Sequence, residues 1–103
     1  MQQEMMHERI RLAYKDAYSY VIPIGSVKLM AVVTETGMIG TVGFDIEAIE
    51  NLGVPAAVVH AGEGMAIESI DDLLDGEVKA ANLHAVQHRV EVGMSGREAL
   101  NRM

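Results

Sequence analysis

MIGTVGFDIEAIENLGVPAAVVHA, residues 38–61, contains two short apolar segments on either side of an amphipathic segment that carries helix signals at both ends. Asp45 stands where a helix N-cap is expected, and Gly53 is typical of the left-handed residue that ends a helix. Three apolar side chains would share the buried face of this helix: Ile46, Ile49 and Leu52. The stretch therefore predicts a parallel strand-helix-strand crossover, which is right-handed in nearly all proteins.

The residues before this unit alternate between polar and apolar in the manner of strands. Residues 8–14 and 18–24 form two such runs, joined by a turn at 15–17, and Pro23 falls on the face opposite Tyr18, Tyr20, Ile22 and Ile24. Because proline cannot donate to a ladder, the second run should be an edge near Pro23. Residues 27–34 and 38–44 flank a short connection that ends in Gly37, which favours a hairpin with a positive φ at that glycine.

The residues after the unit are mostly helical. Ser69 with Asp72 predicts a short capped helix that ends at Gly76, and Asn82 caps a second one. Residues 77–81 fit either a further strand or a connector. In GMSGREAL, residues 93–100, Ser95 and Glu98 have the spacing of a capping box, in which each side chain serves the other residue's backbone N–H. The fold class predicted is α+β, with N-terminal antiparallel strands, one β-α-β crossover in a mixed sheet, and C-terminal helices packed on one face.

Composition bounds the class of protein. The chain of 103 residues is predicted to be one domain, with residues 1–24 as an oligomerisation region and 25–103 as the α/β core. Half of the residues are hydrophobic, including eight methionines, which is more than a core of this size hides and favours a subunit interface. The sequence has no cysteine, no signal peptide and no apolar run long enough for a bilayer, so a cytoplasmic protein with no membrane partner is expected.

The net charge of −7 argues against a nucleic-acid partner, since phosphate contacts dominate such affinity. Arg9, Arg11 and Lys15 form a small basic group that is more typical of a solvated face. Nothing in the sequence points to a cofactor.

The ordered segments GMIGTVGFDIEAIENLG, PAAVVHAGEG, SIDDLLDGEV and VEVGMSGREALNRM resemble the YunC-like family of bacterial and archaeal domains of unknown function. This resemblance covers residues 18–103. It implies an α/β domain whose N-terminal strands mediate tetramer formation, and it implies no activity. Relatives often carry a cysteine in the strand before the position of Asp45, whereas this chain has Thr41, Val42 and Gly43 there, so a thiol-based role is excluded.

His60 is the strongest candidate for chemistry. It ends a predicted buried strand and precedes a glycine-rich loop, the place where open α/β sheets bind ligands. His60 would act as a general base and Glu63 would orient it or bind a cation, with Gly62 and Gly64 as ligand-binding candidates. The alternative is a strand-to-loop turn with a hydrogen-bonded histidine.

Two other groups are candidates for sites. His84 and His88 stand four residues apart on a predicted helix, a spacing that lets two imidazoles share a metal, but no third ligand is placed and the solvated face of a helix explains them as well. Arg97 lies at a helix start, where a guanidinium could help bind a phosphate; against this, the region lacks the Walker lysine and the Ser95 cap occupies the same amides.

The tyrosines cluster in the N-terminal strands. Tyr14, Tyr18 and Tyr20, together with Ile22, are therefore predicted to form the oligomer interface, because tyrosine combines a large apolar face with a polar tip. The leading hypothesis is a non-catalytic small binding or regulatory module that acts as a homo-oligomer, with a tetramer expected and its small-molecule ligand unknown. The alternatives are a small-molecule enzyme built around His60 and Glu63, and a structural assembly protein without a ligand.

Overall fold

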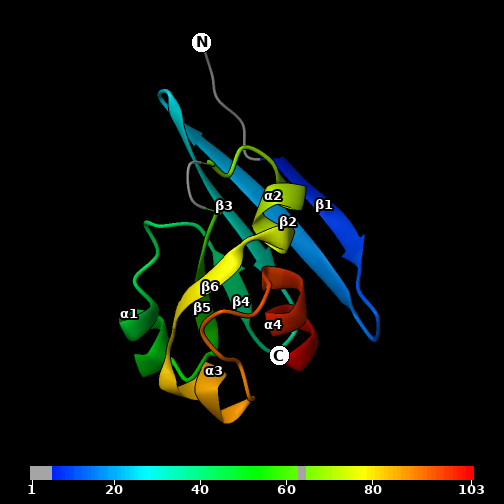
Figure 1. Cartoon of the computed structure of the whole chain (residues 1–103), viewed down its shortest axis with the longest axis vertical. Coiled ribbons are helices and arrows are strands. Elements are labelled where there is room, and N and C mark those ends of the chain that lie inside the picture. Colours follow the sequence, from blue (N-terminus) through cyan, green and yellow to red (C-terminus); the bar gives the residue numbers. More distant parts are fainter. Residues whose placement is uncertain (1–5, 63–64) are drawn as a thin grey trace.

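Six strands lie side by side in sequence order in the computed structural model, which describes residues 6–62 and 65–103. They are β1 (Met6–Arg11), β2 (Asp16–Ile24), β3 (Val27–Val33), β4 (Met38–Gly40), β5 (Ala56–His60) and β6 (Glu77–Ala81). Neighbouring strands are antiparallel except for β4 and β5, which are parallel because the crossover helix separates them. The predicted mixed α+β sheet is confirmed, and residues 77–81 are a strand rather than a connector (Figure 1).

Each helix begins at the residue that the sequence predicts. The helices are α1 (Ile46–Asn51), α2 (Ile70–Asp75), α3 (Leu83–Gln87) and α4 (Gly96–Arg102). Their N-caps are Asp45, Ser69, Asn82 and Ser95, and each side chain accepts a hydrogen bond from a backbone N–H two or three residues further on. The Ser95 hydroxyl accepts from the N–H of Glu98 at 3.0 Å, but the Glu98 carboxylate lies 3.5 Å from Arg102 instead of returning to Ser95.

The crossover unit departs from the prediction at Leu52. Asp45 and Gly53 behave as predicted, the latter with φ +80° and its N–H bonded to the carbonyl of Glu50. Leu52, however, is 78% exposed because α1 ends at Asn51 and Leu52 is already its C-cap. The helix therefore buries Ile46 and half-buries Ile49, but Leu52 does not belong to the buried stripe.

Two predicted turns also differ. β1 ends at Arg11, and the turn spans residues 12–15, with Leu12 donating its N–H to the carbonyl of Lys15. Tyr14 consequently lies in this turn, 87% exposed, and not on a strand face. Gly37 does not have a positive φ; a Cβ there would lie 2.7 Å from the carbonyl oxygen of Pro55, so glycine is required by the close approach of the residue before β5.

Helices α2 and α4 pack on one side of the sheet, here called the inner face (Figure 1). A Cβ on Gly96 would lie 2.6 Å from the carbonyl oxygen of Leu73 and 2.9 Å from the Cδ1 of Ile39, so α4 starts in direct contact with both α2 and β4. The opposite face is covered at β4 by Phe44, whose ring lies against Gly40. The C-terminal helices α2 and α4 thus cover one face, as predicted.

Asn82 joins the crossover to α3. Its side chain is 1% exposed and makes four hydrogen bonds. The Oδ1 atom accepts from the N–H of Ala56 at 3.0 Å and of Ala85 at 2.9 Å, while Nδ2 donates to the carbonyls of Ile46 at 3.1 Å and Val54 at 2.9 Å. One side chain therefore connects α1, β5 and α3, and none of its four hydrogen-bonding positions is left unsatisfied.

Candidate functional site

An apolar strip covers one side of strands β2 and β3. The register pairs Tyr18 with Val33, Tyr20 with Ala31, Ile22 with Leu29 and Ile24 with Val27, and paired residues share a face of the sheet. We call this side the outer face of β1–β3, defined by Tyr18, Tyr20, Ile22, Ile24, Val27 and Leu29. Tyr18, Ile22, Ile24 and Val27 are 44%, 37%, 51% and 60% exposed. A continuous exposed strip of aromatic and β-branched side chains is the composition of a protein interface rather than of a solvated sheet.

Strand β1 adds polar groups along one edge of the outer face. The rings of His7 and Tyr20 are stacked, with centroids 5.8 Å apart. Arg9 forms an ion pair with Asp16, and Arg11 lies 3.8 Å from the same carboxylate. The hydrogen bond and charge of Asp16 raise the pKa of Arg9 above its ordinary value. The outer face therefore has an apolar centre with a polar rim.

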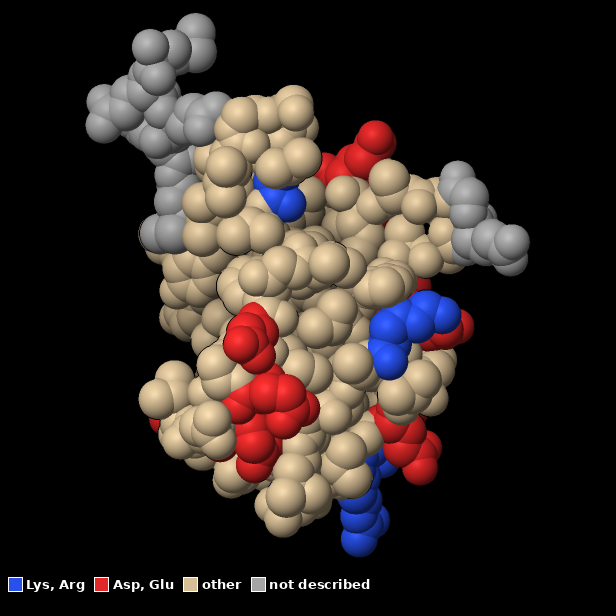
Figure 2. Space-filling model, turned by 90° about the vertical axis from the view of Figure 1, so that its left-hand side faces the viewer, with Lys and Arg blue, Asp and Glu red and all other residues tan. Residues whose placement is uncertain are grey.

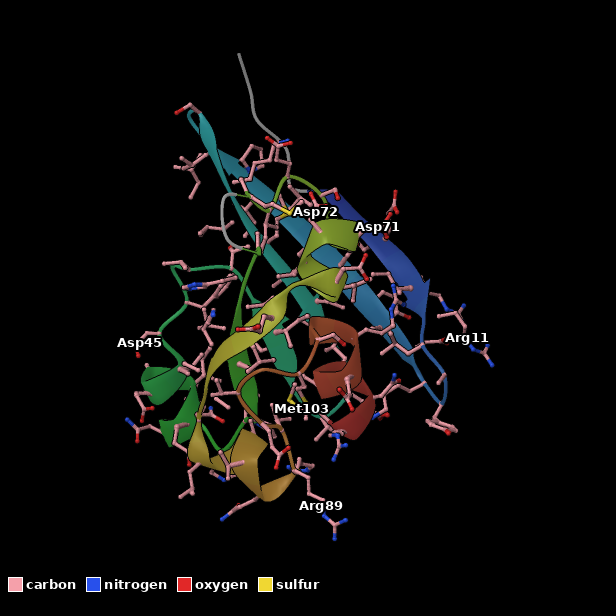
Figure 3. The ribbon with its side chains drawn as sticks, viewed as in Figure 1. Arg11, Asp45, Asp71, Asp72, Arg89 and Met103 are labelled. Atoms are coloured by element: carbon pink, nitrogen blue, oxygen red, sulfur yellow. The ribbon has the colours of Figure 1, made fainter. Side chains whose placement is uncertain are left out.

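Of the four predicted interface residues, three lie together. Tyr18, Tyr20 and Ile22 occupy successive positions on the outer face, two residues apart along β2. Tyr14 lies in the β1–β2 turn, at the end of the strip rather than within it. Arg11, near the same turn, points away from the sheet (Figure 3).

His60 lines a groove of about 330 Å³ at the carboxyl ends of the parallel strands β4 and β5. Thr41, Lys28 and residues 65–67 form its other walls. His60 is exposed, and a Cβ added to Gly62 would lie 3.7 Å from the sulfur of Met65, which is an ordinary contact. Glu63 and Gly64 lie outside the described residues. The structure therefore brings His60 and Lys28 together at the edge where the sheet topology favours ligands.

The chemistry open to this groove is limited by Thr41. Its hydroxyl lies 3.2 Å from the backbone nitrogen of Met30, from which it accepts, and 3.5 Å from the carbonyl of the same residue. The oxygen is thus engaged with the β3 backbone, which leaves His60 and Lys28 as the polar side chains of the groove that can meet a ligand. Such a pair suits binding of an anion or proton transfer, and it lacks an activated nucleophile.

The Nδ1 of His88 is hydrogen-bonded, whereas the Nδ1 of His84 lies within ion-pair distance of a carboxylate. The Nδ1 of His84 lies 2.5 Å from the Glu50 carboxylate, which also accepts from the backbone N–H of His84 at 2.8 Å. The Nδ1 of His88 lies 2.9 Å from the carbonyl of His84. Within residues 6–62 and 65–103, no group of three or more His, Cys, Asp or Glu side chains is arranged to hold a metal ion. His84 thus joins α3 to Glu50 of α1, whereas His88 contacts only the carbonyl of His84 within its own helix.

Arg97 lines a second hollow, here called the inner cleft, of about 410 Å³ between β1–β3, α2 and the start of α4. The other lining residues come from β1, β2, β3, residues 68–69 and α2. Figure 3 shows Asp71, one of these neighbours, at the start of α2. The backbone N–H of Gly96, the residue before Arg97, donates to the carbonyl of Gly76 at 3.1 Å. This amide is therefore not free to bind a phosphate.

The fold and these surfaces define a small α+β domain with a mixed sheet, an exposed strand face and two hollows on or beside the opposite face. The chain belongs to the family described as Domain of unknown function (DUF1805), whose model matches residues 43–103. It is 32% identical over 82 residues to the uncharacterized protein YunC of Bacillus subtilis strain 168, covering 80% of each chain. The resemblance to YunC-like proteins is thus confirmed.

A solved structure has the same fold. The crystal structure of a protein of unknown function, TA1206 from Thermoplasma acidophilum, superposes with a TM-score of 0.85 over 99% of this chain and 95% of that one, at 19% identity. At this identity the likeness concerns the fold alone. Within the described residues, no helix is long and apolar enough to cross a membrane.

Proposed function

We propose that this protein is a homo-oligomeric binding module, which assembles as a tetramer through the outer face of β1–β3 and binds a small molecule elsewhere on the domain. The observation that carries the proposal is the apolar strip of the outer face, in which Tyr18, Ile22, Ile24 and Val27 are exposed and Tyr20 and Leu29 are half-buried. Burying apolar surface contributes about 25 cal/mol for each Å² taken from water, so a second copy is a favourable cover. The polar rim of His7, Arg9 and Asp16 supplies the boundary that interfaces commonly have.

The charge distribution supports self-association over binding to nucleic acid. On the face drawn in Figure 2, Lys and Arg are found at separate points and form no continuous basic patch, while Asp and Glu lie at several points with their largest group at the lower left. The Arg9 guanidinium at the rim of the outer face is already paired with Asp16. Phosphate recognition needs several unpaired cations on one surface.

Thiol labelling tests which surface is covered, because the chain has no cysteine of its own. Ile24→Cys would place a thiol on the outer face, and Val86→Cys would place the matched control on α3; the two native side chains are 51% and 52% exposed. In the folded protein at tens of micromolar, we expect Ile24→Cys to react with maleimide at least about tenfold more slowly than Val86→Cys. In urea, where the chain is unfolded, the two variants should react at equal rates. Equal rates in the folded protein would contradict assembly through this face.

An enzyme is the second candidate function, and the position of His60 beside Lys28 at the ends of β4 and β5 favours it. In that case His60 transfers a proton and Lys28 holds a negatively charged substrate. A turnover found by metabolite screening should be lost in His60→Gln and kept in His88→Gln. Retention of turnover in His60→Gln would exclude this site.

A further inference from the structure

The inner cleft carries charged side chains of both signs. Five charged side chains line it: Glu8, Lys28, Glu68, Asp71 and Arg97. Among the described residues, none of the five forms an ion pair, although other charged side chains on the surface do, such as Arg9 with Asp16 and Glu98 with Arg102. Two unpaired cations and three unpaired anions therefore surround one hollow.

The remainder of the cleft is largely apolar, with His7, Ser19 and Ser69 as its other polar lining residues. Ile10, Val21 and Ile70 line it while half-buried, and Met30 and Leu74 line it while almost fully buried. The Ser19 hydroxyl, 3% exposed, donates to the carbonyl of Glu8 at 3.3 Å and so is engaged by β1. A volume of about 410 Å³ lies within the range of small-molecule pockets. An apolar surface surrounded by charges of both signs is complementary to a ligand with an apolar body and two opposite charges.

The cleft stays open in the proposed assembly. Ser19 and Val21, which line it, alternate along β2 with Tyr18, Tyr20 and Ile22, so the cleft and the outer face lie on opposite sides of the same strands. A sister subunit on the outer face therefore leaves the cleft accessible to solvent.

We propose that the inner cleft binds a small zwitterion with an apolar body, the chemistry of a free apolar α-amino acid. Arg97 and Lys28 meet its carboxylate, Glu8, Glu68 and Asp71 meet its ammonium group, and the apolar side chains of β1–β3 and α2 cover its body. A guanidinium is the better partner for a carboxylate because it donates two parallel hydrogen bonds. This inference rests on the proposed function and names the class of its ligand.

Calorimetric titration with three probes tests the charge requirement. L-Leucine carries both charges, L-leucinamide lacks the carboxylate, and N-acetyl-L-leucine lacks the ammonium group. We expect saturable binding of L-leucine, and binding of each of the other two at least about tenfold weaker. No saturation by L-leucine up to about 10 mM, or equal affinity for all three probes, would overturn the proposal.

Variants assign the two charges to their partners. Arg97→Gln should weaken L-leucine binding by about tenfold and leave the affinity for L-leucinamide unchanged, while Glu68→Gln should weaken both ligands. Arg102→Gln and Glu35→Gln, which change the same residue types outside the cleft, serve as controls and should bind as the native protein does. Equal losses of affinity for L-leucine in the cleft variants and the control variants would contradict the proposed site. Thiol labelling of the outer face does not depend on these titrations, so the two proposals fail separately.

Discussion

Replacing Asn82 tests the argument that one buried amide connects three elements. Asn82→Ala removes the hydrogen-bond partner of the Ala56 and Ala85 N–H groups and of the Val54 carbonyl. The lost N-cap costs about 1 kcal/mol. Each buried group left without a partner costs about 1–3 kcal/mol more. We expect a loss of about 4 kcal/mol, a large part of the roughly 5–15 kcal/mol that such a domain possesses.

Asn82→Asp separates shape from hydrogen bonding. The carboxylate still accepts from Ala56 and Ala85, but it turns a second acceptor toward the carbonyls of Ile46 and Val54. Burial among carbonyls raises the pKa of this carboxyl group in the folded state, so the variant should gain stability relative to Asn82→Ala as the pH falls from about 7 toward 5. A protonated carboxyl can donate one of the two missing hydrogen bonds.

Urea unfolding at one fixed protein concentration measures these differences, since association makes stability depend on concentration. Asn51→Ala is the control, because Asn51 is exposed at the end of α1 and should change stability by less than about 0.5 kcal/mol. A loss below about 1 kcal/mol for Asn82→Ala, similar to that of the control, would refute the reasoning.

Three further stability predictions are checked by the same measurement. Gly96→Ala should destabilise the protein by about 2 kcal/mol, because the added Cβ would lie 2.6 Å from the carbonyl oxygen of Leu73. An unchanged midpoint of urea unfolding would show that α4 can move to make room for the methyl group. Arg89 has a left-handed φ of 67°, and its side chain points away from the domain (Figure 3). Arg89→Gly should therefore raise the free energy of unfolding by about 0.5–1 kcal/mol. A lower free energy of unfolding would show that the arginine side chain makes stabilising contacts. Ser95→Ala should cost about 1 kcal/mol through its lost cap while Arg97→Ala costs little, and the reverse order would mean that Arg97 is structural.

Local patterns predict most of the secondary structure. The four N-caps, the left-handed Gly53 and the parallel crossover all follow from residues within a few positions of one another, and the structure contains them. The pattern is wrong about Leu52 because its periodicity continues past the end of α1, where Gly53 turns the chain away. Periodicity identifies a face, but it does not say where a short helix ends.

Contacts between distant segments are not predictable in this way. Asn82 has the local pattern of an N-cap, yet its other partners lie 26 to 36 residues away. Gly37 has the local pattern of a turn glycine, whereas the approach of Pro55 is what requires it. The charged residues of the inner cleft extend from Glu8 to Arg97, and no spacing in the sequence connects them.

The mass of the native chain in solution tests the central claim, that copies of this protein cover the outer face of β1–β3. Sedimentation equilibrium at tens of micromolar should give one species of about four times the chain mass of 11.2 kDa. A single species of 11.2 kDa under the same conditions would show that the strip Tyr18 to Leu29 stays exposed to solvent, and it would contradict the account.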